Sequence, residues 1–197
     1  QTFKSYVGEL GTAFPQDCPA DFARWLMAQL SVEIPPERWE GLRPRYGSLE
    51  ALLGALEALF APEGWRIATS SGTSGRASIM VRDAATFSLA LDSFFLGIRH
   101  AWGIDLDTRL IFVMPEETRI AMAQAARFGT EKLGYVDRGL VNYTIPFPAS
   151  PDVIRIRTGR TLRPGLRGWL EQHIAAPFMN WMGEHMAMPR SVRTTAA

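Results

Sequence analysis

The sequence predicts an α/β fold, a layered sheet with flanking helices. The hydrophobic pattern changes from helical spacing to strand-like runs near residue 65, and strand-like and helix-like segments then alternate to about residue 128. The chain has 197 residues, 47% of them hydrophobic and 21% charged, which is ordinary globular composition and enough for a sizeable core. We therefore expect residues 1–197 to form a single α/β domain.

Two helices are predicted in the first third of the chain. Pro19 suits the first position of a helix over residues 19–30, and Ser48 can cap a second helix from Leu49 to Phe60. The stretch between them, from Val32 to Tyr46, contains three prolines and is predicted to be a surface connection. Apolar residues recur at helical spacing in both helices, at Phe22, Trp25, Leu26 and Leu30 and at Leu49, Leu52, Leu53, Leu56 and Phe60.

Two short strands are predicted on either side of a polar loop. Trp65–Thr69 and Ser78–Arg82 have strand-like composition, and the residues from Ser70 to Gly75 between them include no apolar side chain. We expect the two strands to be neighbours in a sheet. Asp83 can cap the helix that follows.

The middle of the chain predicts a buried strand and a helix. Leu110–Met114 is a continuous apolar run bounded by Pro115, which is typical of a strand buried on both faces. A helix is predicted from about Glu116 to Phe128.

The last third predicts two more strands, at Val141–Ile145 and Val153–Arg157, and a helix over Gly165–Met186 that Pro177 should kink or split. This helix is rich in soft apolar side chains, which we interpret as core or as an interface with further parts of the protein rather than as a cofactor site. The group extends two residues past the predicted helix and comprises Trp169, Phe178, Met179, Trp181, Met182, Met186 and Met188.

The polar loop is the candidate binding site. Glycines let a backbone bend so that successive N–H groups point inward, and such a nest binds anions. Hydroxyl groups add hydrogen-bond donors with little bulk, so the loop is predicted to bind nucleotide phosphates through Ser70, Ser71, Gly72, Thr73, Ser74 and Gly75. The loop is not a Walker A motif, because no Gly-Lys-Ser/Thr follows at the required spacing.

The segment Thr69–Gly75 resembles the phosphate loop of adenylate-forming enzymes, whose usual form is Ser/Thr-Ser-Gly-Thr-Thr/Ser-Gly. Many acyl-CoA synthetases carry Pro-Lys shortly after the last glycine, where this chain has Ala77 and Ser78. That departure is closer to the phenylacetate–CoA ligase and LuxE-type acyl-protein synthetase branch. The resemblance extends over residues 45–115 and implies a partial adenylate-forming N-terminal domain.

The resemblance also implies a reaction. A small-molecule carboxylate attacks the α-phosphate of ATP, and the acyl-adenylate passes its acyl group to an acceptor thiol, which is coenzyme A or a protein cysteine. The loop would hold the β- and γ-phosphates, with Mg²⁺ offsetting their charge. Catalysis of the first step is mainly positioning and charge stabilisation.

Three later motifs of the family are not found in this sequence. No aromatic-Gly-x-Thr-Glu segment is present for Mg²⁺, and no lysine stands in a recognisable catalytic context. Arg157–Arg160 resembles an Arg-Thr-Gly-Asp segment, but Arg160 stands in place of the ribose-binding aspartate. We therefore assign no catalytic residue, and we expect this chain, which begins at Gln1, to be an incomplete domain that is inactive alone.

Two other functions stay open. The chain can be a non-catalytic nucleotide- or anion-binding α/β module, or a structural domain in which the Ser/Gly loop is only a turn. A hydrolase with Ser71 as nucleophile is disfavoured, because the surrounding residues are not Gly-x-Ser-x-Gly and no triad is recognisable.

The remaining features predict few further partners. The single cysteine, Cys18, suits a cytoplasmic protein, and no apolar run is long enough for a membrane span. The net charge of +1 argues against nucleic acid. We expect structural or surface roles rather than metal binding for His100, His173 and His185, and a solvated surface, with a coenzyme A phosphate as the alternative, for Arg155, Arg157, Arg160, Arg163 and Arg167.

Overall fold

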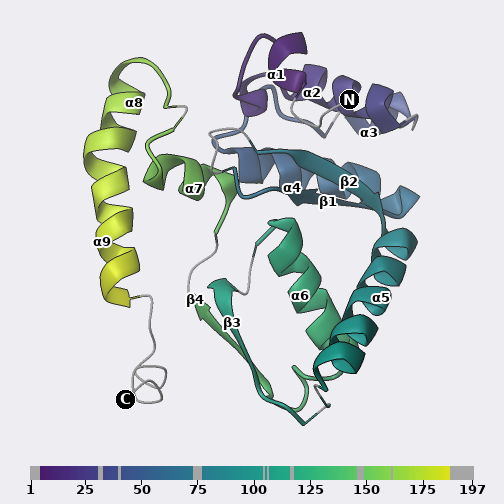
Figure 1. Cartoon of the computed structure of the whole chain (residues 1–197). Helices are drawn as coiled ribbons and strands as arrows, with labels where there is room; N and C mark the ends of the chain where they lie inside the picture. The colour runs from purple at the N-terminus through teal and green to yellow at the C-terminus, as the bar shows by residue number, and fades with distance from the viewer. Residues whose placement is uncertain are drawn as a thin grey trace.

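A computed structural model gives the fold of the chain (Figure 1), and it describes residues 5–30, 33–39, 41–72, 77–103, 105, 107–115, 118–145, 149–160 and 162–186. The elements in chain order are α1 (Tyr6–Glu9), the 3₁₀ turn η1 (Pro15–Asp17), α2 (Pro19–Leu30), α3 (Pro36–Trp39), α4 (Leu49–Phe60), the 3₁₀ turn η2 (Ala61–Glu63), β1 (Trp65–Thr69), β2 (Ile79–Asp83), α5 (Ala84–Trp102), β3 (Leu110–Pro115), α6 (Ala121–Lys132), β4 (Val141–Ile145), α7 (Pro151–Arg157), α8 (Gly165–Leu170), the π-helix η3 (Glu171–Ala175) and α9 (Ala176–Met186).

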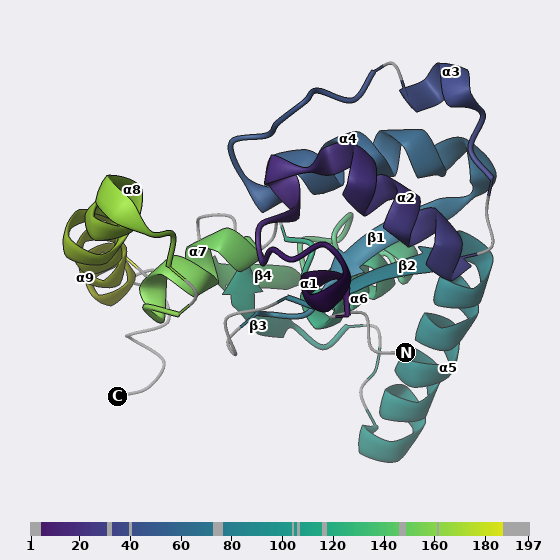
Figure 2. The same cartoon turned by 90° about the horizontal axis from the view of Figure 1, so that it is seen from above.

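The fold combines helices and sheets, as the sequence predicts, but the described strands do not join into one layered sheet. The described strands form two separate two-stranded sheets, β1 with β2 and β3 with β4. The β1–β2 sheet lies beside α4, and the β3–β4 sheet lies with α5 and α6 on one side of that layer (Figures 1 and 2). In the part of the chain that is described, no helix combines the length and the apolar character needed to cross a lipid bilayer.

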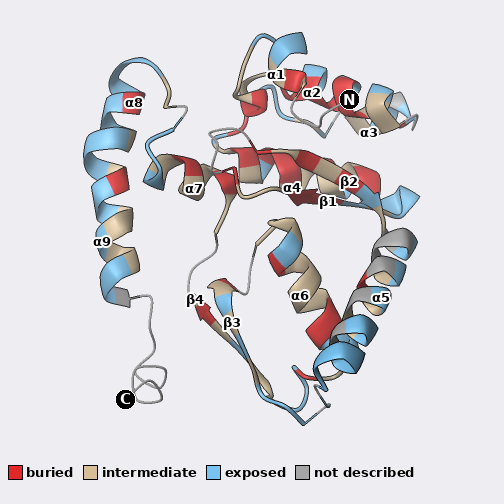
Figure 3. Ribbon diagram, in the orientation of Figure 1, coloured by how far each residue is buried: buried red, intermediate tan, exposed pale blue. Residues whose placement is uncertain are grey.

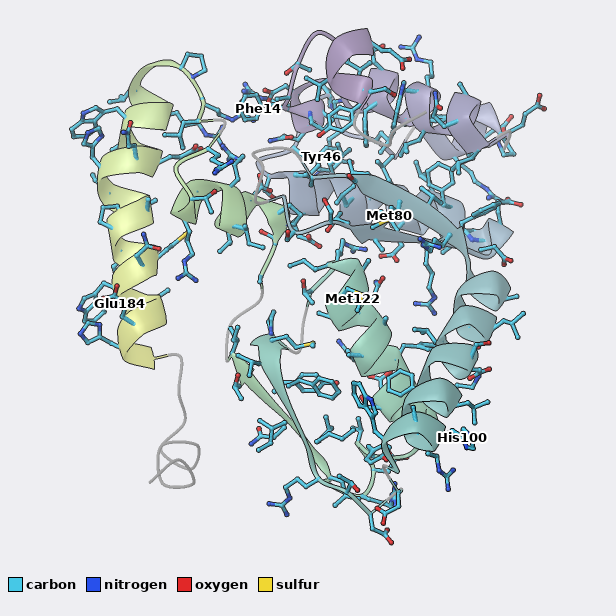
Figure 4. All side chains as sticks on the ribbon, viewed as in Figure 1. Phe14, Tyr46, Met80, His100, Met122 and Glu184 are labelled. Atoms are coloured by element: carbon cyan, nitrogen blue, oxygen red, sulfur yellow. The ribbon has the colours of Figure 1, made fainter. Side chains whose placement is uncertain are left out.

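The main hydrophobic core lies between α2, α4 and the β1–β2 sheet, and Figure 3 shows the buried residues concentrated there. Helices α2 and α4 have the predicted bounds. The Ser48 hydroxyl caps α4 by accepting a hydrogen bond from the Ala51 N–H at 3.1 Å. Tyr46 lies between the α1–α2 segment and the α4 layer, and Phe14 lies at the edge of the α1–α2 segment that faces α7 (Figure 4), with the guanidinium of Arg163 4.3 Å from the centroid of its ring. The largest fully buried side chains of this core are Tyr6, Phe22, Leu26, Leu52, Leu53, Leu56, Phe60, Ile67 and Ile79.

The predicted strands around the polar loop are confirmed. β1 and β2 pair antiparallel, with Trp65 opposite Asp83 and Thr69 opposite Ile79. Asp83 ends β2, and its carboxylate accepts a hydrogen bond from the Ala85 N–H at 3.0 Å, as expected of the residue that caps α5. The hairpin therefore presents the loop at the end of β1.

β3 and β4 are parallel strands, with Leu110 opposite Val141. The prediction that β3 is buried on both faces is wrong, because Ile111 is 53% and Val113 81% exposed. α6 covers the other face, where the Thr130 hydroxyl lies 3.1 Å from the hydroxyl of Tyr143. A continuous apolar run predicts burial only where both faces receive a neighbour, and the described residues cover just one.

Two predicted elements have the wrong bounds or type. The helix predicted from Glu116 begins instead at Ala121, because Ile120 forms a parallel bridge to Thr69 and keeps that stretch extended; Glu116 itself lies outside the described residues. The strand predicted at Val153–Arg157 is part of helix α7. Its Ser150 cap accepts a hydrogen bond from the Val153 N–H at 3.3 Å, and a proline occupies the first turn.

The final helix is continuous from α8 through η3 to α9, and we call residues Gly165–Met186 the C-terminal rod. The rod stands beside α7 at one side of the molecule (Figure 1). The helix is not split at Pro177, which lies in the first turn of α9; the departure from α-helical hydrogen bonding is the π-helical segment η3 just before it. Proline has no N–H and its ring crowds the carbonyl four residues earlier, so the α-helical pattern breaks just before it.

Candidate functional site

The polar loop begins at a hydrogen-bonded neck. The Ser70 N–H donates to the Ser78 carbonyl oxygen at 2.9 Å, and the Ser70 hydroxyl accepts a hydrogen bond from the Ser78 N–H at 2.8 Å. This pair extends the hairpin by one residue beyond the last strand pair. Ser70 is therefore occupied in closing the neck of the loop, a role that the sequence did not predict.

Gly72 has the backbone conformation that the loop hypothesis requires. Its φ of 71° lies in the left-handed region, which favours glycine, and it is buried. A Cβ at this position would lie 3.5 Å from the Cβ of Ala77. Ser71 is half-buried, while Thr73, Ser74 and Gly75 of the predicted site lie outside the described residues.

Thr69 ties the start of the loop to a second part of the fold. It is fully buried, and its N–H donates to the Arg119 carbonyl oxygen at 2.6 Å beside the parallel bridge to Ile120. Its Oγ1 is buried and has no hydrogen-bond partner among the described residues. A buried hydroxyl usually has a partner, so Thr69 supplies a donor and an acceptor at the root of the loop.

The segments that follow β3 and β4 approach the end of β1 at Thr69. β1 ends there, the segment after β3 bridges to it through Ile120, and the segment after β4 joins through the Thr118 hydroxyl, which donates to the Ala149 carbonyl oxygen at 2.7 Å. In an open parallel α/β sheet, ligands bind outside the carboxyl ends of the strands. Here the described parallel pairing is that of β3 with β4 and the isolated bridge between Thr69 and Ile120, and the loop leaves β1 beside that bridge.

Arg119 joins this edge to α4. Its guanidinium bonds the Glu50 carboxylate at 2.5 Å and also the Glu57 carboxylate, and we call these three residues the Arg119 clasp. Burial acts to lower the pKa of Arg119, but the hydrogen bonds and charges of Glu57 and Glu50 raise it, so the guanidinium stays charged. The two glutamates are seven residues apart in α4, which places them on one helix face.

One cavity adjoins the loop, and a second lies beside the Arg119 clasp. A polar cavity of about 370 Å³, which is within the range of small-molecule pockets, lies beside the Arg119 clasp and is also lined by Arg66, Thr118 and Gln124. A cavity of about 20 Å³ adjoins Gly72 and is large enough for about one water molecule. Only the larger cavity has room for part of a ligand.

The basic run predicted to be solvated is instead largely engaged in ion pairs. Arg155 is buried and bonds the Glu171 carboxylate at 3.2 Å, while Arg163 bonds the Asp17 carboxylate at 2.6 Å. Arg155 also pairs with Asp152, three residues earlier, at 3.6 Å. Glu171 and Asp17 lie 16 and 146 positions away in the sequence, so no local pattern indicated these two partners. The prediction of a solvated surface at these two positions is wrong.

The other sequence candidates lie away from the loop or in structural positions. Thr158 and Gly159 form the C-terminal end of α7, with Gly159 at a φ of 63°, so the resemblance of this segment to a ribose-binding motif reflects a helix end. His100, His173 and His185 are exposed. Within the described ranges, no group of three or more His, Cys, Asp and Glu residues is placed to hold a metal ion.

Comparison with protein-family models, with curated proteins and with solved structures finds no match to this chain. The site is therefore interpreted from its own geometry and from the resemblance of its loop.

Proposed function

We propose that this chain contributes the phosphate-binding loop of an enzyme that activates a carboxylic acid with ATP and transfers the acyl group to a thiol. The observation that carries the proposal is the position of Ser70–Gly72, the described part of the loop, which leaves β1 where the segments after β3 and β4 approach it. Gly72, with its left-handed backbone, and the hydroxyl of Thr69, which has no hydrogen-bond partner among the described residues, support it.

In this proposal the loop binds the departing phosphates, and the polar cavity beside the Arg119 clasp receives the part of the ligand beyond them. Backbone N–H groups around a left-handed glycine suit an anion. Among the described residues that line the cavity at Gly72, the carboxylate is that of Asp152, which accepts hydrogen bonds from the N-terminus of α4 and pairs with Arg155. The described residues of this cavity therefore do not fit a magnesium site, and no step is assigned to the metal.

The second candidate is a nucleotide- or anion-binding module without catalysis, and it rests on the same loop geometry. The acyl substrate, the choice between coenzyme A and a protein cysteine, and membership of a longer enzyme come from the resemblance alone. They stay predictions.

The first experiment measures binding. Titration of the chain with ATP, with and without Mg²⁺, should shift the amide resonances of Gly72 and its loop neighbours first, with an affinity near the millimolar range, about 4 kcal/mol. Gly72→Ala should weaken this response, because alanine is strained at a φ of 71°, whereas Gly103→Ala, with a φ of 63° at the end of α5, is the matched control. Shifts spread evenly over the surface would favour a plain turn.

The second experiment measures turnover. Pyrophosphate release with a panel of aliphatic and aromatic acids should be absent from this chain and present in a version extended downstream, where Thr73→Ala and Gly75→Ala should suppress it. Loss of one well-placed electrostatic contact commonly lowers a rate by ~10²–10³. Nucleotide binding without release in either version would support the non-catalytic module.

A further inference from the structure

The outward side of the C-terminal rod carries a row of large exposed side chains, which we call the aromatic stripe. Figure 3 shows this side as exposed, and Figure 4 shows ring side chains standing on it, away from the rest of the molecule. The apolar members are between 41% and 74% exposed. The stripe comprises Leu166, Trp169, Leu170, His173, Ile174, Phe178, Trp181 and His185.

The π-helical segment η3 keeps the stripe on one side. The residues of the aromatic stripe recur in steps of four, from Trp169 to His173 and from Trp181 to His185. In an uninterrupted α-helix, each step of four residues moves the side chain by about 40° around the helix axis. A π-helix turns less per residue because its hydrogen bonds span five residues. The segment from Glu171 to Ala175 therefore offsets the winding.

The opposite side of the rod is already fixed to the fold. Glu171 bonds Arg155 at 3.2 Å, and the Asn180 side-chain oxygen accepts a hydrogen bond from the Arg157 Nε at 3.0 Å. Gly168 approaches the backbone of residue 163 so closely that a Cβ there would overlap its carbonyl oxygen. The rod is held by its inner side, so it cannot turn the stripe inward.

The rings of the stripe are ordered in two similar units. Trp169 stacks on His173 with ring centroids 5.0 Å apart, and Trp181 stacks on His185 at 4.8 Å. Each histidine Nδ1 also lies within hydrogen-bond distance of the carbonyl oxygen of its tryptophan, at 3.0 and 2.8 Å. Side chains that are ordered before contact lose less entropy when they are buried.

We propose that the aromatic stripe is the interface of a homodimer in which two copies of the rod pack antiparallel. Reversal of the rod about Pro177 places Trp169 opposite His185 of the second copy and His173 opposite Trp181, so the stripe is complementary to itself, as a two-fold interface requires. Pro177 is exposed and lies at the axis.

The exposed apolar area and the charge of the rod favour a second copy of the rod as the binding partner. A half-exposed large side chain offers roughly 100 Å², since aromatic side chains bury ~150–250 Å² each. The six apolar side chains then offer about 600 Å² per copy, which approaches the ~800 Å² per partner of a specific interface. Helices that lie on lipid carry a basic polar face, whereas the rod has one arginine, Arg167, against two glutamates, Glu171 and Glu184.

Analytical ultracentrifugation of the chain at micromolar to submillimolar concentrations tests the proposal. We expect a monomer–dimer equilibrium whose Kd rises at least about 10-fold in Phe178→Glu and Trp181→Glu. Leu89→Glu is the matched control, because Leu89 is similarly exposed but lies on α5, and it should leave the Kd unchanged. A monomer at every concentration, or equal dimers in all variants, would overturn the proposal.

Disulfide trapping tests the antiparallel arrangement. In a Cys18→Ser background, Pro177→Cys should form a covalent dimer, whereas Leu166→Cys should not, because antiparallel packing separates the two copies of residue 166 by about 33 Å. Equal cross-linking by both variants would indicate parallel packing and refute the arrangement. Binding of a monomeric chain to phosphatidylcholine–phosphatidylglycerol vesicles would assign the stripe to lipid instead.

Discussion

Replacement of Arg119 by methionine should lower the free energy of unfolding by about 2 kcal/mol. This cost lies between that of breaking an exposed ion pair and that of breaking a buried one. The Arg119 side chain is 18% exposed, and the carboxylates of Glu57 and Glu50 are 25% and 39% exposed. Removal of one partner of a buried pair costs about 3–5 kcal/mol, and an exposed pair contributes about 0–1 kcal/mol. The carboxylates of Glu57 and Glu50 are half-buried and regain some hydration when Arg119 is removed, so the cost of the substitution should fall between these limits.

The assay is urea denaturation of the wild-type chain and four variants. Methionine keeps much of the length of the arginine side chain, so the comparison isolates the charge and its hydrogen bonds. Glu57→Gln should cost less than Arg119→Met, and the double variant should reveal a coupling energy of about 1 kcal/mol. Arg24→Met removes an exposed ion pair to Asp21, and it is the matched control with an expected effect below about 1 kcal/mol.

The same variants test the link between the Arg119 clasp and the loop. The Thr69 N–H bonds the backbone of Arg119, so displacement of that segment should shift the Thr69 amide resonance and speed its hydrogen exchange. If Arg119→Met were no more destabilising than Arg24→Met, and the Thr69 amide were unchanged, the clasp would have no role in holding the strand ends together.

Three further predictions follow from single groups. Burial acts to raise the pKa of Asp17, but hydrogen bonds and charge, chiefly from Arg163, outweigh it and hold the pKa below its ordinary 3.8. The contribution of Asp17 to stability is therefore present above pH 3.8 and is lost as the pH falls through the folded pKa. Asp17→Asn should flatten that part of a pH–stability profile by about 1 kcal/mol. Burial and neighbouring carboxylates raise the pKa of the Cys18 thiol. Alkylation of Cys18 by iodoacetamide at pH 8 should therefore be at least about 10-fold slower in the folded chain than in urea. Equal rates would contradict this prediction. Ser70→Ala removes the acceptor of the Ser78 N–H and should cost about 1 kcal/mol, with faster hydrogen exchange at Ser78; unchanged exchange would show that the neck does not depend on this bond.

The sequence alone determined the elements whose cause is local. α2 and α4 follow from apolar residues at helical spacing, and the Ser48 cap acts within three residues of itself. The β1–β2 hairpin follows from two strand-like runs around a polar loop. α7 shows a conflict between two local patterns, in which the alternating residues Val153–Arg157 suggested a strand and the Ser150 cap decided for a helix.

Only the tertiary structure decided which distant residues meet. The late start of α6 depends on the bridge between Ile120 and Thr69, and the exposure of Val113 depends on which faces of β3 receive a neighbour. Arg119 bonds Glu50 across 69 positions of sequence, and Arg163 bonds Asp17 across 146. Spacing along a helix or strand reports contacts within a few residues, whereas these pairs form only because folding brings separate segments together. For this reason the sequence indicated the loop residues of the candidate site but not the Arg119 clasp that ties the root of the loop to α4.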